Sequence, residues 1–299
     1  MTQNVDRETV VSRLLGTDDI LILCHKNPDG DTIGSGAALC KALQHLGKTA
    51  AVLCSDPIPA MYDYMQITVY DGSFTPAFVV AVDVAGIQLF GDHNNIQDYA
   101  EHVDLCIDHH GSNTKYAKHY VIRPEAASTT EIMYDLLFTM ETEITSQIAD
   151  CIYTGITTDT GCFRYTNATS RTYIVAAHMM DKGADVFFGD ASAVDSGARQ
   201  AIDEYNAAQG SVKVFDIAQP ADLLGQNECI IGSQVTDNSA MVGACMEAVE
   251  AGKLGGDVIY GTLENGALSA GAVADIVPAE VKEQYAAYIE EMKAGTFMK

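Results

Sequence analysis

The sequence has none of the features that mark disulfide-rich, zinc-finger or membrane proteins. Its eight cysteines are scattered through 299 residues without any C-x-x-C pair, which excludes a disulfide scaffold and the common kind of structural zinc site. The chain has no apolar run of about 18 residues, and its beginning shows no basic-then-apolar signal pattern. We therefore expect reduced thiols, no membrane partner and a cytoplasmic location.

Basic residues are also scarce. The chain has 17 basic against 41 acidic residues, a formal net charge of -24. A surface this negative repels phosphate backbones, so we expect no tight binding of long nucleic acid. An apolar fraction of 47% and a length sufficient for about two domains describe an ordinary globular protein.

Short apolar runs alternate with segments of helical period in the first part of the chain. The runs are Ile20 to Cys24, Ala50 to Cys54, Phe78 to Val82 and Val103 to Ile107, and one helical segment is Thr32 to Leu46. This alternation predicts an α/β fold with a mostly parallel sheet flanked by helices. Residues 126–181 turn helical and open with the S-x-x-E pattern of a capping box at residues 128–131, for which we expect a structural role.

The rest of the chain repeats the α/β rhythm, which predicts a second, smaller α/β domain. We place the two domains at residues 1–185 and 186–299, and all eight histidines lie in the first. The predicted strands are Val186 to Phe188, Val212 to Phe215, Cys229 to Gly232 and Val258 to Tyr260, and the predicted helices cover about residues 196–207, 239–251 and 278–293.

Polar side chains follow the predicted strands, at the end where α/β proteins bind ligands. The first group, His25-Lys26-Asn27-Pro28-Asp29-Gly30-Asp31, lies where a strand gives way to a helix. Unpaired buried charges cost too much for these residues to be core. They either bind a metal or form a polar turn with Asp31 near a helix N-terminus. Asp83, at the end of another strand, is either a ligand or a capped strand end.

Two further groups add imidazoles and another acid. Asp108, His109 and His110 follow an apolar strand, and because neighbouring side chains point different ways, the two histidines should differ in role. Asp159 closes a helical segment within T-T-D-T-G. The clustered carboxylates would repel one another without cations, and oxygen and nitrogen ligands without thiolate suit Mn²⁺, Mg²⁺ or Fe²⁺. A shared carboxylate fits two ions roughly 3.5–4 Å apart, which would let an acidic protein accept a phosphate.

These motifs together carry a family resemblance. H-x-N-P-D-G-D-T-I-G-S, the isolated strand-end aspartate, D-H-H and T-D-T-G-x-F-R-Y occur in this order within residues 15–185. They resemble the DHH phosphoesterase superfamily, specifically its nanoRNase and phosphoadenosine-phosphate phosphatase branch, which is related to RecJ. The resemblance implies a hydrolase that acts on phosphoadenosine phosphate or on oligonucleotides of a few residues. It further implies attack by a hydroxide that two divalent ions activate, Mn²⁺ or alternatively Mg²⁺, without a covalent enzyme intermediate.

The resemblance also implies a role for each motif residue. The implied ligands are His25, Asp29 and Asp83 for one ion, and Asp31, Asp83, His109 and Asp159 for the other. Asp83 would thus bridge the two ions. His110 would contact the substrate phosphate, with Asp108 supporting it as an outer partner. Arg164, which follows the Asp159 motif, is the basic residue that we favour for substrate contact, and homodimer formation is left open.

The second part of the chain departs from that family pattern. It has no histidine and no Gly-Gly-Gly-His loop, the feature with which the family grips the far end of its substrate. Three segments, within residues 183–189, 196–201 and 255–281, instead resemble the C-terminal portion of basic membrane protein (PnrA-like) substrate-binding proteins. This resemblance covers about residues 183–299 and implies a composite chain, the alternative being a divergent substrate domain.

Three functions therefore compete. The first is a two-metal phosphoesterase. The second is a module that binds a nucleoside or another small solute through the later part. The third is a composite that keeps the metal cluster but turns over little, since remote contacts that position a substrate supply much of the rate.

Overall fold

The computed structural model describes residues 2–183, 186–188, 192–253 and 260–296. The chain divides into two compact units, Met1–Ala184 and Asp185–Lys299. We describe each unit by itself. Among the described residues, every helix is too short or too polar to cross a membrane.

The first unit is built on a six-stranded sheet in which every strand pairing is parallel, in the order β1-β6-β5-β4-β2-β3. The strands are β1 (Gln3–Asn4), β2 (Ile20–Leu23), β3 (Ala50–Leu53), β4 (Phe78–Val82), β5 (Leu105–Asp108) and β6 (His119–Ile122). Every residue of β2, β3, β4 and β5 is buried. Strands covered on both faces read as continuous apolar runs, which is why the sequence pattern located them.

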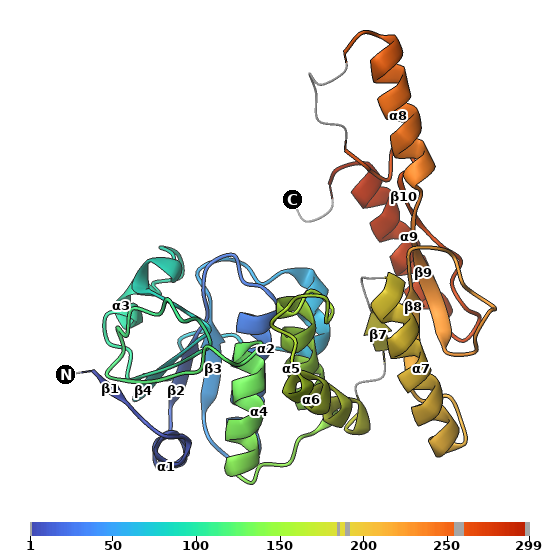
Figure 1. Cartoon of the computed structure of the whole chain (residues 1–299). Helices are drawn as coiled ribbons and strands as arrows, with labels where there is room; N and C mark the ends of the chain where they lie inside the picture. Colours follow the sequence, from blue (N-terminus) through green and yellow to red (C-terminus); the bar gives the residue numbers. More distant parts are fainter. Residues whose placement is uncertain (1, 184–185, 189–191, 254–259, 297–299) are drawn as a thin grey trace. The chain divides into compact units, whose positions relative to one another are not determined.

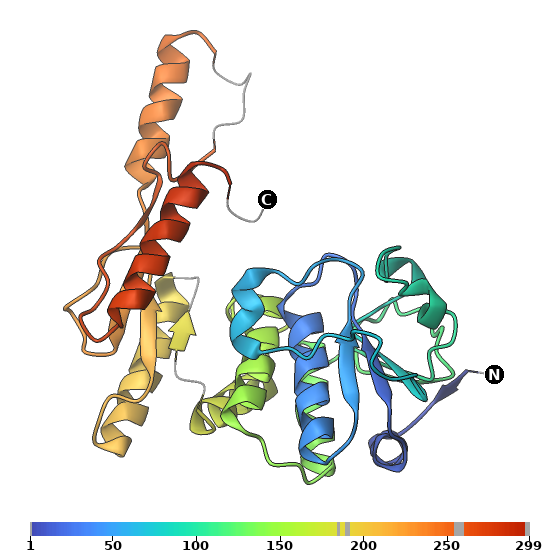
Figure 2. The same ribbon diagram turned by 180° about the vertical axis from the view of Figure 1, so that it is seen from behind.

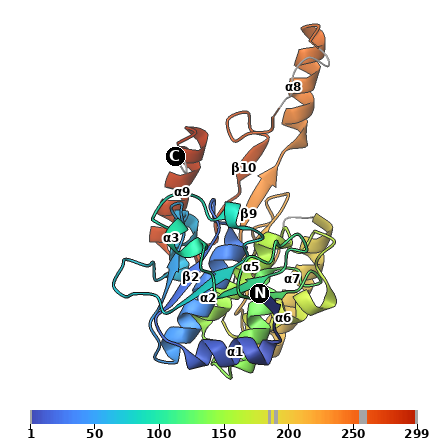
Figure 3. The ribbon, with the colours of Figure 1, turned by 90° about the vertical axis from the view of Figure 1, so that its left-hand side faces the viewer.

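Helices cover both faces of this sheet. They are α1 (Arg7–Gly16), α2 (Gly30–His45), α3 (Gln97–Ala100), α4 (Thr129–Thr139), α5 (Ser146–Asp159) and α6 (Ser170–Asp181), with the 3-10 helices η1 (Ala60–Met65) and η2 (Ile87–Leu89). The helices α2, α4 and α5 pack side by side (Figure 1). Figure 3 shows α1 and α3 at different ends of this unit.

Glycine allows α5 to approach both α2 and α4 closely. A Cβ on Gly34 would lie 2.4 Å from the backbone oxygen of Cys151, and a Cβ on Gly155 would lie 2.3 Å from Cγ2 of Thr130. On the opposite face of the sheet, Phe90 and Ile96 are fully buried in a cluster with Leu21 and other strand residues. The sheet is therefore the middle layer of three, as the predicted α/β fold requires, and that prediction is confirmed.

The second unit contains a smaller, four-stranded sheet in the order β10-β9-β8-β7. Its elements are β7 (Val186–Phe188), α7 (Ser192–Gln209), β8 (Phe215–Ala218), β9 (Ile230–Thr236), α8 (Asn238–Glu250), β10 (Leu268–Ala270) and α9 (Ala279–Lys293). The first three strands run parallel and β10 is antiparallel to β9. Figure 2 shows α9 alongside the strands of this unit.

Some predicted elements differ from the structure. The strand expected from Val212 begins only at Phe215, because the Asn206 side chain accepts hydrogen bonds from the Lys213 and Val214 amides and donates one to the Val214 carbonyl. These backbone groups are therefore unavailable to a strand ladder. The strand expected at Val258 to Tyr260 falls mostly outside the described residues. The short strands β1, β6 and β10 were not predicted.

Candidate metal centre

The predicted site residues follow the carboxyl ends of three neighbouring parallel strands. His25 lies after β2, Asp83 after β4, and Asp108 ends β5. Because β4 pairs with both β2 and β5, these ends meet at one edge of the sheet. The distances below show that the histidines and aspartates of the four motifs converge there.

The loop after β2 turns directly into helix α2. Asp29 is the N-cap residue, and its Oδ1 accepts hydrogen bonds from the amides of Asp31 (3.0 Å) and Thr32 (3.1 Å). The capping turn that we considered as an alternative is thus present, centred on Asp29 rather than on Asp31. It coexists with the clustering of acids, because His25 Nε2 still lies 3.6 Å from Asp29 Oδ1.

His25 faces two carboxylates. Its Nδ1 lies 2.7 Å from the Lys26 carbonyl oxygen, and its Nε2 lies 3.7 Å from Asp83 Oδ2. Burial opposes the charged ring, but hydrogen bonding to Asp29 and Asp83 outweighs it and raises the pKa of His25 to about 11. A positive charge is therefore favoured at this position, whether a proton or a metal ion supplies it.

Asp83 occupies the centre of the cluster. It is 3% exposed, and its Oδ1 accepts a hydrogen bond from the Thr129 hydroxyl at 2.9 Å. The same Oδ1 lies 3.7 Å from His109 Nε2, so the two carboxylate oxygens face different histidines. Its backbone is left-handed, with a φ of 59°. Among residues with a Cβ, Asp and Asn tolerate that conformation best.

Asp31 is a fully buried carboxylate held by the first turn of α4. Its Oδ2 accepts the Thr129 amide at 2.7 Å, and its Oδ1 accepts the amide and the hydroxyl of Thr130 at 2.9 and 2.8 Å. Burial, then the negative charges of Asp83 and Asp159, raises the pKa of Asp31 well above its usual value despite these hydrogen bonds. A cation beside Asp31 would keep it ionised.

His109 presents an unpaired nitrogen to the acids. Its Nδ1 lies 3.3 Å from the Ala126 carbonyl oxygen, which can only accept, so in the neutral ring the proton belongs on Nδ1 and Nε2 carries a lone pair. Nε2 is buried, and no atom of the described residues makes a hydrogen bond to it. It lies 3.2 Å from Asp159 Oδ2 and 4.0 Å from Asp31 Oδ2. A buried lone pair that faces carboxylates is repulsive unless a cation lies between them, so this donor set fits a metal ion.

Asp159 closes helix α5 and completes the ring of acids. Burial, together with the charges of Asp83 and Asp29, raises the pKa of Asp159 to about 6 although His109 opposes the shift. The loop that follows has three consecutive left-handed residues, Gly161, Cys162 and Phe163. Such conformations cost free energy and cluster at functional sites. Arg164 follows this turn as an exposed residue.

His110 differs from His109 in its contacts. Its Nδ1 lies 2.8 Å from Oδ1 of the buried Asp108 and 3.5 Å from Asp83 Oδ1, and its side chain is 44% exposed. The hydrogen bond to Asp108 raises the pKa of His110 to about 9 against partial burial. Asn113 donates to the other Asp108 oxygen at 2.6 Å. Asp108 thus orients a partly exposed imidazole beside the cluster and favours its protonated form.

Three overlapping groups of these residues could hold a metal ion, since one ligand atom from each member lies within 4.8 Å of the others. They are His25, Asp29 and Asp83; Asp31, His109 and Asp159; and Asp83, His109 and His110. The first two contain every residue of the implied ligand sets, with Asp83 close to both histidines. The third group shows that distance alone does not distinguish His110 from the proposed ligands. However, Nδ1 of His110, the atom that lies near Asp83, is already engaged in a hydrogen bond with Asp108.

Sequence reasoning missed the residues that hold the acids in place. Thr129 and Thr130 belong to the segment expected to be a helix cap, and Ser128 does accept the Glu131 amide at 3.2 Å. The two threonines, however, bind Asp31 and Asp83. A run of three hydroxyl residues at a helix start was the available signal. Asn167, which donates to the Asp159 and Ala127 carbonyls, had no signal that we can identify.

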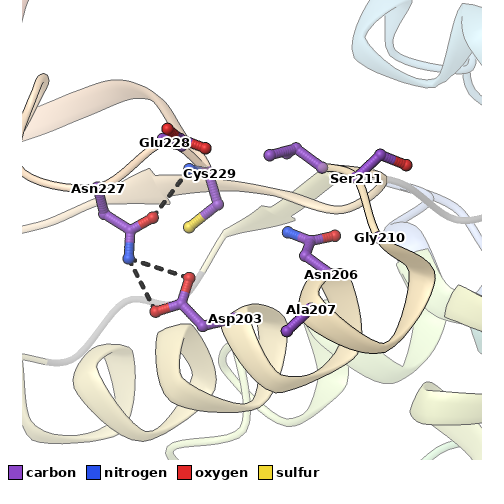
Figure 4. A pocket seen from close by; sticks show the side chains of 9 residues that line it. Asp203, Asn206, Ala207, Gly210, Ser211, Asn227, Glu228 and Cys229 are labelled. Atoms are coloured by element: carbon purple, nitrogen blue, oxygen red, sulfur yellow. Dashed lines mark hydrogen bonds between the residues drawn. The ribbon is translucent and has the colours of Figure 1, made fainter.

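A pocket of about 390 Å³ in the second unit is shown in Figure 4. Three of its polar side chains are already paired: the Asn227 amide donates to both oxygens of Asp203 at 3.0 and 2.8 Å, and Asn206 binds neighbouring backbone. Burial, then the charge of Asp203, raises the pKa of the Cys229 thiol to about 12, so it is unreactive at neutral pH. We assign no reaction to this pocket. The resemblance of residues 183–299 to a solute-binding protein stays a prediction.

Comparison with known proteins relates part of the first unit to a known family. Residues 19–156 match the model of the DHH family, N-terminal domain. The chain is 33% identical over 179 residues to the bifunctional oligoribonuclease and PAP phosphatase NrnA of Thermus thermophilus, covering 55% of this chain and 50% of that protein. It is 30% identical to a probable manganese-dependent inorganic pyrophosphatase of Enterococcus faecalis, covering 56% of each.

One solved structure is also similar to this chain. The exopolyphosphatase-related protein of Bacteroides fragilis is 25% identical, with a TM-score of 0.54, over 60% of this chain and 57% of that one. The chain spans about half the length of the curated relatives described above. The geometry, the family model and these relatives concern the same segment: residues 19–156 form a DHH family N-terminal domain.

Proposed function

We propose that this protein is a two-metal phosphoesterase that hydrolyses phosphoadenosine phosphate or oligonucleotides of a few residues. The observation that carries the proposal is the lone pair of His109 Nε2, buried among the carboxylates of Asp31, Asp83 and Asp159. With a neutral His109 ring, this arrangement needs a cation between the nitrogen and the carboxylates. The substrate class follows the printed name of the Thermus thermophilus relative, an oligoribonuclease and PAP phosphatase.

The ligand sets are proposed as the sequence predicted them. His25, Asp29 and Asp83 would hold one ion, and Asp31, His109 and Asp159, with Asp83 shared, would hold the other. Oxygen and imidazole ligands without thiolate favour Mn²⁺, with Mg²⁺ as the alternative. The name of the Enterococcus faecalis relative, a manganese-dependent enzyme, supports the same choice. Homodimer formation and a cytoplasmic location stay predictions.

Bound divalent ions would lower the pKa of water and neutralise charge on the phosphoryl group. Side chains of the protein supply the other interactions with the substrate. His110, whose charged form is favoured by the hydrogen bond to Asp108, donates a hydrogen bond to a phosphate oxygen and stabilises the charge that develops there. Asp108 fixes the ring in position through its 2.8 Å hydrogen bond. Arg164 supplies a second positive charge from the turn after Asp159.

The test is hydrolysis of phosphoadenosine phosphate and of a diadenylate in the presence of Mn²⁺. Asp83→Asn keeps the side-chain size and the left-handed backbone but removes the proposed bridging charge. We expect turnover in the wild type and a loss of at least about 100-fold in Asp83→Asn. The matched control is Asp71→Asn, an exposed acid that accepts only a local turn hydrogen bond. Wild type that loads Mn²⁺ yet hydrolyses neither substrate would refute the proposal.

A further inference from the structure

A pocket in the first unit has no role in the mechanism above. It has a volume of about 470 Å³, within the range of about 300–1,000 Å³ that small-molecule sites occupy. Its lining comes from the segment between β3 and η1, from η1, from the residues that follow η1 and from Asn94. Residues 61–70, which overlap η1, are rich in Met and Tyr.

The pocket is tied to the loop that carries His25 and Asp29. The amide of Asn27, two residues from each of them, donates a hydrogen bond to Asp56 Oδ2 at 2.8 Å, and Asp56 lines the pocket. Tyr62 lines it as well, and the charge of Asp29 contributes, after burial, to a raised pKa of Tyr62. The pocket and the metal centre are therefore joined through the loop that carries His25 and Asp29.

The lining combines apolar walls with carboxylates. Pro57, Ile58, Tyr62 and Ile67 supply apolar surface that suits a flat ring. Asp56 and Asp63 add two negative charges, which disfavour a phosphate in this pocket. The Asp63 carboxylate has no side-chain partner within the part of the chain that the structure describes. A carboxylate beside an apolar wall is suited to accept hydrogen bonds from the amino group of a base.

We propose that this pocket binds a nucleobase of the substrate, and that it favours bases with an exocyclic amino group over uracil. The proposal rests on the proposed function, because it assumes that the phosphate at the metal centre belongs to a nucleotide. Tyr62 and Ile58 cover the faces of the ring, and Asp63 accepts from its amino group. The pocket thus gives the enzyme a base preference that the metal centre cannot supply.

Two measurements test the proposal. The first is equilibrium binding of guanosine and of uridine to the Mn²⁺-loaded full chain, since nucleosides lack the phosphate that the cluster would hold. The second is KM for diguanylate and for diuridylate. We expect guanosine to bind about tenfold more tightly than uridine, and KM for diguanylate to be lower by a similar factor, as expected for a hydrogen bond to a charged group.

Asp63→Ala, which removes the acceptor, should abolish both preferences, whereas Asp98→Ala, which changes an exposed acid on α3 outside the pocket, should preserve them. If dinucleotides are hydrolysed without base preference and guanosine binds no better than uridine, the pocket proposal is wrong and the enzymatic one stands. If nothing is hydrolysed but Asp63→Ala still abolishes guanosine preference, the pocket binds bases and the phosphoesterase proposal fails.

Discussion

The Nε2 atom of His109 lies 3.2 Å from the Oδ2 atom of Asp159, and it is buried with no hydrogen-bond partner in the part of the chain that the structure describes. The 3.3 Å contact of Nδ1 with the Ala126 carbonyl assigns the ring proton to the other side. The lone pair of one residue therefore faces the negative charge of the other. A cation between the two groups would remove this repulsion.

Removal of metal should destabilise the first unit. A ligand that binds only the folded state stabilises it by about 2.7 kcal/mol when present at 100 times its dissociation constant. For a domain of this size we expect Mn²⁺ to raise the melting temperature by roughly 5–10 °C over chelator-treated protein. Differential scanning calorimetry measures the shift. Equal melting temperatures with Mn²⁺ and with chelator would contradict the proposed site.

Thr129 should act through the aspartates that it positions. Thr129→Val removes the hydroxyl that donates to Asp83 Oδ1 at 2.9 Å and keeps the side-chain shape. Loss of an outer partner commonly lowers metal affinity by about 10–100-fold. Thr139→Val, in the same helix, is the control, because that hydroxyl bonds only a backbone carbonyl of its own helix. Calorimetric titration with Mn²⁺ would show the difference, and equal affinities in the two variants would refute this role.

Asp108 should affect the rate more than substrate binding. Asp108→Asn weakens the orientation and charge of His110, whose Nδ1 lies 2.8 Å from Oδ1 of Asp108. If His110 stabilises charge that develops during reaction, kcat falls by about 10–100-fold while KM changes little. Steady-state kinetics on phosphoadenosine phosphate separates the two constants. A change confined to KM would show that His110 only binds the ground state.

Stability and Mn²⁺ binding should both depend on the close helix packing around Gly155. A Cβ at Gly155 would lie 2.3 Å from Thr130 Cγ2 and 2.8 Å from Asp31 Oδ1. We expect Gly155→Ala to lower the free energy of unfolding by about 1–3 kcal/mol and to weaken Mn²⁺ binding. Gly16→Ala, in α1 with no neighbour within 4 Å, should be neutral or stabilising by up to about 1 kcal/mol. Urea unfolding compares them, and a neutral Gly155→Ala would show that the helices can separate.

The features that the sequence revealed are those encoded locally. The strands β2 and β4 are continuous apolar runs because both of their faces are covered, and the acids and histidines follow them within short motifs. The role of Thr130 was hidden, because its partner Asp31 lies 99 residues away and only the packing of α4 against α2 joins them. The strand shift at Val214 arose from one competing side chain, that of Asn206.

The central claim is that two cations share Asp83, and the number of Mn²⁺ ions bound per chain tests it most directly. Metal analysis after equilibrium dialysis should give two Mn²⁺ per chain for the wild type and for Asp71→Asn. It should give fewer than one for Asp83→Asn, because that residue belongs to both proposed ligand sets. A wild type that binds no Mn²⁺, or an Asp83→Asn variant that still binds two ions, would contradict the account.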